Sequence, residues 1–127
     1  MRVIVVRHAN AAPGEPDDLR PLTDQGREAA RMLGDLLAEQ KPDAVVSSPL
    51  LRARETAQAI AAAAGLEVEV DEHLAPGAVA DDLRAAVDGR GETVVTVGHQ
   101  PDCSEIVHAL TGREVEFPTA GFTEINL

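Results

Sequence analysis

Val3-Ile4-Val5-Val6-Arg7-His8-Ala9-Asn10 carries the strongest structural signal in the chain. Its four consecutive aliphatic residues are mostly β-branched, which is typical of a strand buried on both faces in the middle of a parallel sheet. The run ends at Arg7 and His8, a charged residue followed by a titratable one. Open α/β sheets bind ligands in the crevice outside the carboxyl ends of their strands. We therefore expect Arg7 and His8 to lie at the centre of an active site.

Strand-like and helix-like patterns alternate along the rest of the chain. This order predicts one α/β domain over residues 1–127, with a mainly parallel sheet, helices on both faces and right-handed crossovers. The 68–70 strand alternates with acidic residues, which indicates a position near the sheet edge. The expected strands are 3–6, 44–46, 68–70, 93–97 and 122–127, and the expected helices are 24–40, 50–64, 79–87 and 102–110.

The segment between the first strand and the first helix is expected to be irregular. Residues 11–21 contain three prolines and a glycine, which favour turns, and they lie just beyond His8, where they would wall the site. Thr23 is the expected N-cap of the helix that follows. The apolar residues of that helix recur at helical spacing and predict one buried stripe: Ala29, Met32, Leu33, Leu36 and Leu37.

Composition narrows the class of partner. The formal net charge is -11, so the surface would repel nucleic acid and anionic lipids. No apolar run is long enough to span a membrane, no signal peptide is recognisable, and Cys103 is the only cysteine, which together favour a cytoplasmic protein. Ten of the eleven basic residues are arginine, the residue that binds phosphate bidentately. Oligomeric state is left open by the sequence.

Three of the expected buried strands lead directly into arginine or histidine residues, the kinds of side chain that can bind or transfer a phosphoryl group. Arg7 and His8 follow the first, Arg52 lies in the first helical turn after the second, and His99 follows the fourth. Parallel strands place their carboxyl ends on one side of a sheet, so these four side chains are expected to share one cleft. Two arginines can clamp a tetrahedral anion. One neutral imidazole can attack phosphorus while a second, protonated imidazole stabilises the charge on the oxygens. This set predicts phosphoryl transfer through a phosphohistidine intermediate, without a metal ion.

The chain resembles the histidine phosphatase superfamily, with its phosphoglycerate-mutase-like fold, and within it the short SixA-type phosphohistidine phosphatases. The matching motifs run from one end of the chain to the other and occur in the family's order. They are Val6-Arg7-His8-Ala9, Arg20-Pro21-Leu22-Thr23 with Gly26, Ser48-Pro49-Leu50-Leu51-Arg52-Ala53 with Thr56, and Val97-Gly98-His99.

The resemblance implies a role for each of these side chains. His8 would be the nucleophile, Arg7 and Arg52 would bind the phosphoryl group, and His99 would stabilise the transition state. Asn10 and Arg20 would contact the phosphate or the rest of the substrate. The implied substrate is protein phosphohistidine or a small phosphorylated metabolite, with no cofactor.

Two positions depart from the family pattern. Ala9 replaces the usual glycine, which matters only if that residue needs a positive φ. The larger departure is Pro76, which stands where many members carry the acid that protonates a leaving alcohol; Asp71 or Glu72 could substitute only if the loop is displaced. A missing acid costs about 10²–10⁴ in rate for an alkoxide leaving group and less for an imidazole. The missing acid therefore favours phosphohistidine over alkyl phosphates as the substrate.

Other interpretations compete with this one. The absent acid is compatible with a catalytically weak phosphate-binding module that recognises a phosphorylated partner, and a mutase is a third possibility for which the chain has little room. A metal site is disfavoured, because no local pair has zinc-finger spacing and the arginines would repel a cation.

The remaining polar residues have simpler expected roles. Cys103 is expected to be a packed thiol, with a redox role as the alternative; Arg54 and Glu55 are expected on a solvated face, and His73 and His108 at surface or structural positions.

Overall fold

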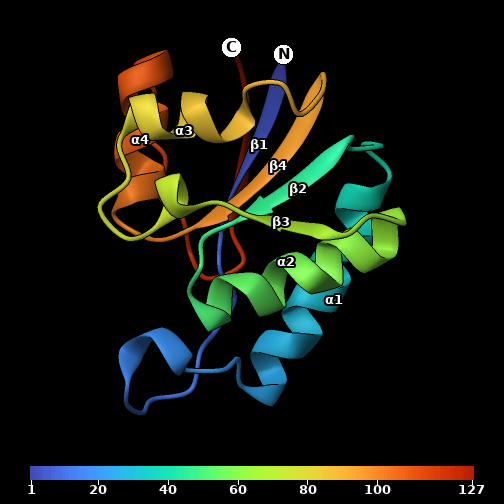
Figure 1. The fold of residues 1–127 in the computed structure, drawn as a ribbon. Coiled ribbons are helices and arrows are strands. Elements are labelled where there is room, and N and C mark those ends of the chain that lie inside the picture. The colour runs from blue at the N-terminus through green and yellow to red at the C-terminus, as the bar shows by residue number, and fades with distance from the viewer.

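The five strands form one sheet in the order β3-β2-β4-β1-β5, and a computed structural model describes all 127 residues (Figure 1). Every neighbouring pair is parallel except β1 and β5, which are antiparallel. The strands are β1 Arg2–Arg7, β2 Ala44–Ser47, β3 Val68–Val70, β4 Thr93–Gly98 and β5 Phe122–Asn126. The helices are α1 Asp24–Ala38, α2 Leu51–Ala64, α3 Ala80–Val87 and α4 Asp102–Thr111, with short 3-10 helices η1 Asp17–Leu19 and η2 Glu72–Leu74.

This architecture confirms the predicted α/β class, element order and mainly parallel sheet. The strand expected near an edge, β3, is at one edge, and β5 closes the other. Thr23 caps α1 as expected, since its hydroxyl accepts the N–H of Gly26 at 2.9 Å. The segment predicted to be an irregular loop, 11–21, contains the short helix η1, which the composition did not indicate.

Both faces of the sheet are covered, because β1 sends alternate side chains into two different cores. Val3 and Val5 pack with the apolar residues of α3 and α4, whereas Ile4 and Val6 pack with those of α1 and α2. Figure 1 shows the two helix pairs on opposite sides of the strands. A strand enclosed in this way must be apolar throughout, which explains why its first polar side chains appear where it leaves the sheet.

The predicted apolar stripe of α1 is only partly right. Leu33 and Leu37 are buried, but Met32 and Leu36 are 63% and 50% exposed. The buried face of α1 includes Gly26 and Gly34, which a count of apolar side chains does not register. A Cβ at Gly34 would lie 2.6 Å from the carbonyl oxygen of Ala59, so glycine allows the two helix backbones to approach closely. The buried face is therefore rotated away from Met32 and Leu36.

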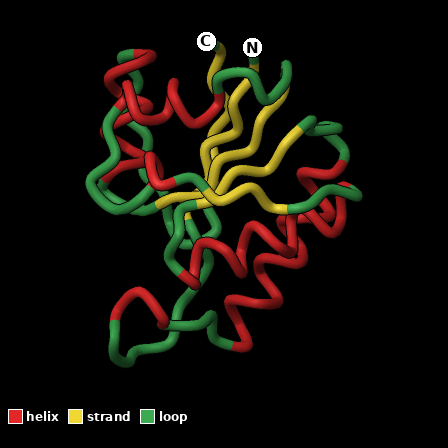
Figure 2. The backbone as a smooth tube through the Cα atoms, in the orientation of Figure 1, coloured by secondary structure: helices red, strands yellow, loops and turns green.

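The two ends of the chain lie together at the amino end of β1. The N–H of Leu127 donates to the carbonyl of Met1 at 2.8 Å, and the terminal amine of Met1 approaches the carbonyl of Leu127 at 3.3 Å. The connections that follow β1, β2 and β4 leave the sheet on the opposite side (Figure 2). No helix has the length and apolarity needed to cross a bilayer.

Candidate active site

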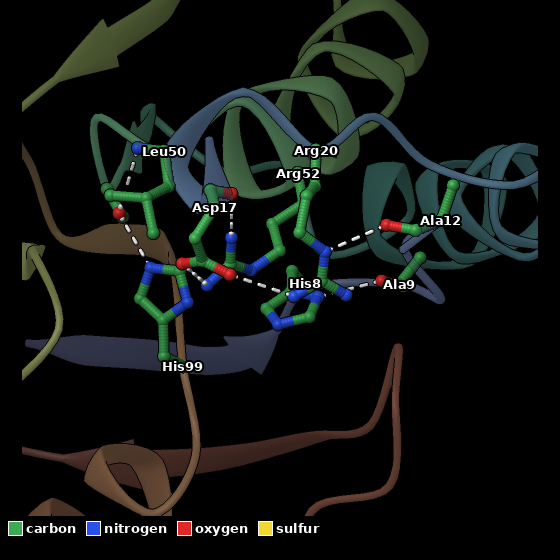
Figure 3. A network of polar contacts seen from close by, with 9 residues as sticks. His8, Ala9, Ala12, Asp17, Arg20, Leu50, Arg52 and His99 are labelled. Atoms are coloured by element: carbon green, nitrogen blue, oxygen red, sulfur yellow. Dashed lines mark hydrogen bonds and ion pairs between the residues drawn. The ribbon is translucent and has the colours of Figure 1, made fainter. Parts of the chain in front are cut away.

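The register of the sheet brings the predicted site residues together. Arg7 pairs with Gly98 at the ends of β1 and β4, so His8 and His99 follow at adjacent positions. Their ring centroids are 5.3 Å apart. Ser47 pairs with Val97, which places Ser48, and the start of α2 just beyond it, beside the same strand end. Figure 3 shows the side chains of His8, Arg52 and His99 grouped there, as predicted.

His8 is held with one ring nitrogen engaged. Its Nδ1 lies 2.7 Å from the carbonyl oxygen of Ala9, which can only accept, so Nδ1 carries a proton and the lone pair of a neutral ring is on Nε2. Burial lowers the pKa of His8 below 6.5, and the charges of Arg52, Arg7 and Arg20 lower it further, although the bond to Ala9 acts in the opposite direction. At neutral pH His8 therefore presents an uncharged nitrogen with a free lone pair, the form needed for nucleophilic attack.

The two arginines differ in how they are held. Arg52 is 92% buried in the first turn of α2, and its guanidinium donates to the backbone carbonyl of Asp17 at 2.9 Å and to the Asp17 carboxylate at 3.2 Å. Arg7 donates from one terminal nitrogen to the carbonyl of Phe117 at 3.0 Å. A cation near a helix N-terminus opposes the helix dipole, so the burial of Arg52 there indicates that an anion offsets its charge.

Asp17 is the anion that occupies this position in the structure. One carboxylate oxygen accepts from Arg52, and the other accepts from Arg20 at 2.9 Å (Figure 3). The hydrogen bond from Arg20 is the main reason that the pKa of Asp17 is lowered. Asp17 was not among the predicted site residues; the available signal was its position three residues before Arg20 in a proline-rich segment.

His99 is 96% buried and is bonded through Nε2 to the hydroxyl of Ser48 at 2.7 Å. Burial lowers the pKa of His99 to about 4, with further lowering by His8, Arg52 and Arg7 that Asp17 partly opposes. In the ligand-free protein at neutral pH this ring is therefore uncharged, which differs from the protonated imidazole expected from the sequence. Ser48 begins the family-like motif that contains Arg52, but the sequence did not predict a role for its hydroxyl.

Two buried side-chain nitrogen or oxygen atoms in the chain have no hydrogen-bond partner, and both belong to this cluster. They are Nε of Arg7 and Nδ1 of His99. An unpaired buried polar group costs about 1–3 kcal/mol, so such groups are rare in folded proteins and require an explanation. The oxygens of a bound anion would satisfy both atoms.

Neighbouring residues fix the backbone around His8. The N–H of Ala9 donates to the hydroxyl of Thr56 at 3.0 Å, and that hydroxyl donates to the carbonyl of Arg52 at 2.9 Å. This chain of bonds ties the residue after the nucleophile position to α2. Ala9 does not have a positive φ, so the replacement of glycine by alanine causes no backbone strain.

The other two predicted contact residues are placed differently. Arg20 is close to the cluster, and its Nε donates to the carbonyl of Ala12 at 2.8 Å. The exposed side chain of Asn10 lies 3.4 Å from the hydroxyl of Thr23 and is not bonded to the cluster. Glu55, expected on a solvated face, instead accepts the N–H of Leu22 at 2.8 Å, because the approach of α1 to α2 brings that backbone within reach.

Pro76 itself carries no acidic group, and Glu72 is exposed in η2 with no side-chain hydrogen bond to the cluster. The two residues after Pro76, Gly77 and Ala78, donate their N–H groups to the buried carboxylate of Asp102 at 2.8 and 3.2 Å, which holds the loop against α4. Asp71 is not displaced toward the site. Burial acts to raise its pKa, but hydrogen bonds from Arg90 and from the backbone and ring of His73 lower the pKa of Asp71 to about 2, so it stays ionised.

Cys103 and the remaining histidines have structural or surface positions. Burial raises the pKa of Cys103 to about 12, so its thiol stays protonated, as expected for a packed residue rather than a redox-active one. His73 and His108 are both exposed. No group of three or more His, Cys, Asp or Glu side chains is arranged to hold a metal ion.

The buried histidines predict a loss of stability in mild acid. The unfolded chain protonates histidine near pH 6.5, whereas folded His99 does so only near pH 4, so the unfolded state binds more protons between these values. The free energy of unfolding should fall as the pH is lowered from 6.5 to 4, by roughly 3 kcal/mol at most from His99. His8 acts in the same direction.

Urea unfolding at pH 7, 5.5 and 4.5 measures this effect. The matched variant is His99→Asn, which cannot titrate and should show a smaller decrease than the wild type. Equal slopes in the two proteins would show that His99 does not stay neutral in the folded state.

Comparison with known proteins is consistent with the arrangement of the site. A family model described as the histidine phosphatase superfamily (branch 1) matches residues 3–76. The chain is 30% identical to the phosphohistidine phosphatase SixA of Escherichia coli, over 100% of this chain and 86% of that protein. It is 34% identical to an uncharacterised protein of Picosynechococcus, over 95% of this chain and 82% of that one. Among solved structures, the protein histidine phosphatase SixA complexed with tungstate has a TM-score of 0.88 at 28% identity, with 100% of this chain and 88% of that chain covered.

Proposed function

Because this chain belongs to the histidine phosphatase superfamily (branch 1) and is a phosphatase, we propose that it transfers the phosphoryl group of its substrate to His8 and then to water. The proposed substrates are protein phosphohistidine and, as the alternative, a small phosphorylated metabolite. The single observation that carries this proposal is the convergence of a neutral imidazole with a free Nε2 and two unpaired buried nitrogens, Nε of Arg7 and Nδ1 of His99.

In the first step, Nε2 of His8 attacks phosphorus in line with the leaving group. The carbonyl of Ala9 keeps the proton on Nδ1, so no base has to remove one before attack. The bond between phosphorus and the leaving atom breaks as the bond to Nε2 forms. In the second step, water attacks the phosphohistidine, and inorganic phosphate leaves with His8 restored.

The positive charge for both steps would come from the arginines. Arg7, Arg52 and His99 are proposed to bind the three oxygens of the phosphoryl group, with Arg20 and the exposed Asn10 contacting phosphate or the rest of the substrate. Fixed donors in a partly desolvated site stabilise developing charge more strongly than water does. A metal ion is therefore not required in the proposed reaction.

The position of Pro76 supports a leaving group that needs no acid. Asp71 is bound by Arg90 and stays ionised, so it cannot supply a proton. The imidazole of phosphohistidine can leave already protonated, whereas an alcohol leaves as an alkoxide unless it is protonated. The similarity to the phosphohistidine phosphatase SixA supports the same substrate class.

A leaving-group panel tests the proposed function. Phosphate release would be measured from a phosphohistidine protein, an aryl phosphate and an alkyl phosphate, each in the presence of EDTA. We expect turnover of the first two and a rate about 10²–10⁴ lower for the alkyl phosphate. Equal rates for alkyl and aryl phosphates would contradict the absence of an acid, and loss of activity in EDTA would contradict metal independence.

The same panel addresses a second candidate function, a phosphate-binding module with little catalysis. The missing acid is the observation that favours it. Phosphate binding without turnover and without a trapped phosphoenzyme would support this module, whereas turnover at about 1 s⁻¹ or faster would exclude it.

Removal of the Asp17 carboxylate is expected to strengthen phosphate binding. In the ligand-free protein this group takes donors from Arg20 and Arg52 that the phosphoryl group is proposed to use. A neutral side chain would compete less and would leave the site more positive, so Asp17→Asn should lower the Kd for inorganic phosphate by about tenfold.

Isothermal titration calorimetry with inorganic phosphate measures this change. Asp18→Asn is the control, since Asp18 lies next in η1 and makes no hydrogen bond or ion pair. Weaker binding by Asp17→Asn would indicate that Asp17 orients the two arginines instead of competing with phosphate.

A further inference from the structure

Ser48 and His99 form a buried pair at the ends of neighbouring strands. The parallel register of β2 and β4 sets Ser48 beside Gly98, and the N–H of Ser48 donates to the carbonyl of Val97 at 3.0 Å. Ser48 has no exposed surface and His99 is 4% exposed. The hydrogen bond between Oγ of Ser48 and Nε2 of His99, 2.7 Å long, is therefore short and shielded from water.

The remaining bonds of the serine hydroxyl determine the direction of this contact. Oγ of Ser48 accepts the N–H of Leu50 at 3.2 Å. The hydroxyl also has one proton to donate, and Nε2 of His99 is the acceptor within reach. If Nε2 carried a proton, the hydroxyl would accept twice and its own buried proton would have no acceptor, which costs about 1–3 kcal/mol. The serine proton is therefore paired only when Ser48 donates it to Nε2 of His99 and Nε2 carries no proton of its own.

The proton of a neutral His99 ring must then be on Nδ1. This nitrogen is buried and has no partner in the ligand-free protein. In Figure 3 it lies on the edge of the ring that faces Asp17 and His8. A proton there would point toward the oxygens of a bound phosphoryl group, whereas a lone pair there would repel them.

We propose that Ser48 is a positioning residue that holds His99 neutral with its proton on Nδ1, so that His99 binds a phosphoryl oxygen as an uncharged donor. This inference rests on the proposed function and names how one of its groups works. The neutral ring of His99 differs from the protonated imidazole expected from the sequence.

The charged surroundings of His99 support a neutral ring. Arg7 and the ring of His8 face it from the end of β1, Arg52 from α2 and Asp17 from η1, and all but Asp17 disfavour a second proton on His99. On the far side, Asp102 and Cys103 of α4 line a cavity of about 10 Å³ next to the ring; this volume is at the lower limit for one water molecule. Burial, the largest cause, and the charges of His8, Arg52 and Arg7 lower the pKa of His99 to about 4, while Asp17 acts in the opposite direction.

Nitrogen NMR of the imidazole rings tests the proposal directly. Long-range ¹⁵N–¹H spectra of the labelled full chain at pH 7.5, with His99 assigned from His99→Gln, distinguish a protonated from an unprotonated ring nitrogen. We expect Nδ1–H and a bare Nε2 in the free protein and with saturating inorganic phosphate. A proton on Nε2 in either state, alone or with Nδ1 also protonated, would overturn the proposal. This readout needs no turnover, so its failure is distinct from the absence of phosphatase activity.

Variants of the two adjacent buried serines separate positioning from general structure. Ser48→Ala should give a mixture of His99 tautomers and lower kcat by about 10²-fold, the effect of losing one fixed donor to the transition state. Ser48→Thr keeps the hydroxyl and should keep the wild-type tautomer. Ser47→Ala is the matched control, since the hydroxyl of Ser47 donates to the carbonyl of Ser48 and not to the ring. An unchanged tautomer in Ser48→Ala would refute the role of Ser48 even if activity fell. If Ser48→Ala does not fold, the spectra of the wild-type protein still test the proposal, because they show which nitrogen of His99 carries the proton.

Discussion

Replacement of His8 by alanine is expected to lower kcat by about 10⁴–10⁶, the range seen when a covalent nucleophile is removed from an enzyme. His8 is proposed to form the bond to phosphorus, and His99 cannot replace it because its Nε2 is bonded to Ser48. The variant should also fail to accumulate labelled phosphoenzyme when it is mixed with a ³²P-labelled substrate and quenched in alkali, in which phosphohistidine is stable.

The control is His108→Ala, which removes an exposed histidine of α4 whose side chain makes no hydrogen bond. Its activity and phosphoenzyme level should equal those of the wild type. Turnover by His8→Ala within tenfold of the wild type would refute the nucleophile assignment, and label retained in that variant would point to another acceptor.

Replacement of Arg52 by glutamine is expected to reduce kcat/KM by about 10²–10³, corresponding to the loss of a charged donor that stabilises the transition state. The guanidinium of Arg52 is buried beside His8 and His99, so no solvent-exposed cation can move into its place. The loss should appear for aryl phosphate and phosphohistidine alike, because the proposed contact is to the phosphoryl group and not to the leaving group.

Arg31→Gln serves as the control for lost charge. Arg31 is exposed on α1 and pairs with Glu28, so its replacement should leave kcat/KM unchanged. Thermal unfolding of both variants would establish that they remain folded at the assay temperature. A kcat/KM for Arg52→Gln within threefold of the wild type would remove Arg52 from the proposed phosphoryl site.

The sequence predicted the order of elements because the signals for strands and helices are local. Val3, Val5 and their neighbours are apolar without interruption, which is what a strand covered on both faces requires. The prediction for α1 was less accurate for a reason that is also physical. Gly34 contributes no apolar side chain, yet it sets how closely α1 and α2 approach and hence which side of α1 is buried.

The grouping of the proposed site residues was predictable to the extent that it depends on strand ends. Arg7, His8 and His99 follow strands whose parallel register brings them together, and this needs no knowledge of loop conformation. Asp17 lies in a loop whose shape is decided by tertiary contacts, so its bonds to the arginines could not be read from the sequence. The hydroxyl of Ser48 has several possible partners, and only the register of β2 and β4 identifies His99 as its partner.

The adjacency of Met1 and Leu127 has a practical consequence for engineering this protein. Both ends emerge from the amino end of β1, whereas His8 and the other proposed site residues lie at its carboxyl end. A fluorescent protein or surface anchor fused at either end would therefore extend away from the end of the sheet where His8 and His99 lie. A short glycine linker could join the two ends, so the chain is also suited to circular permutation with new ends in an exposed turn.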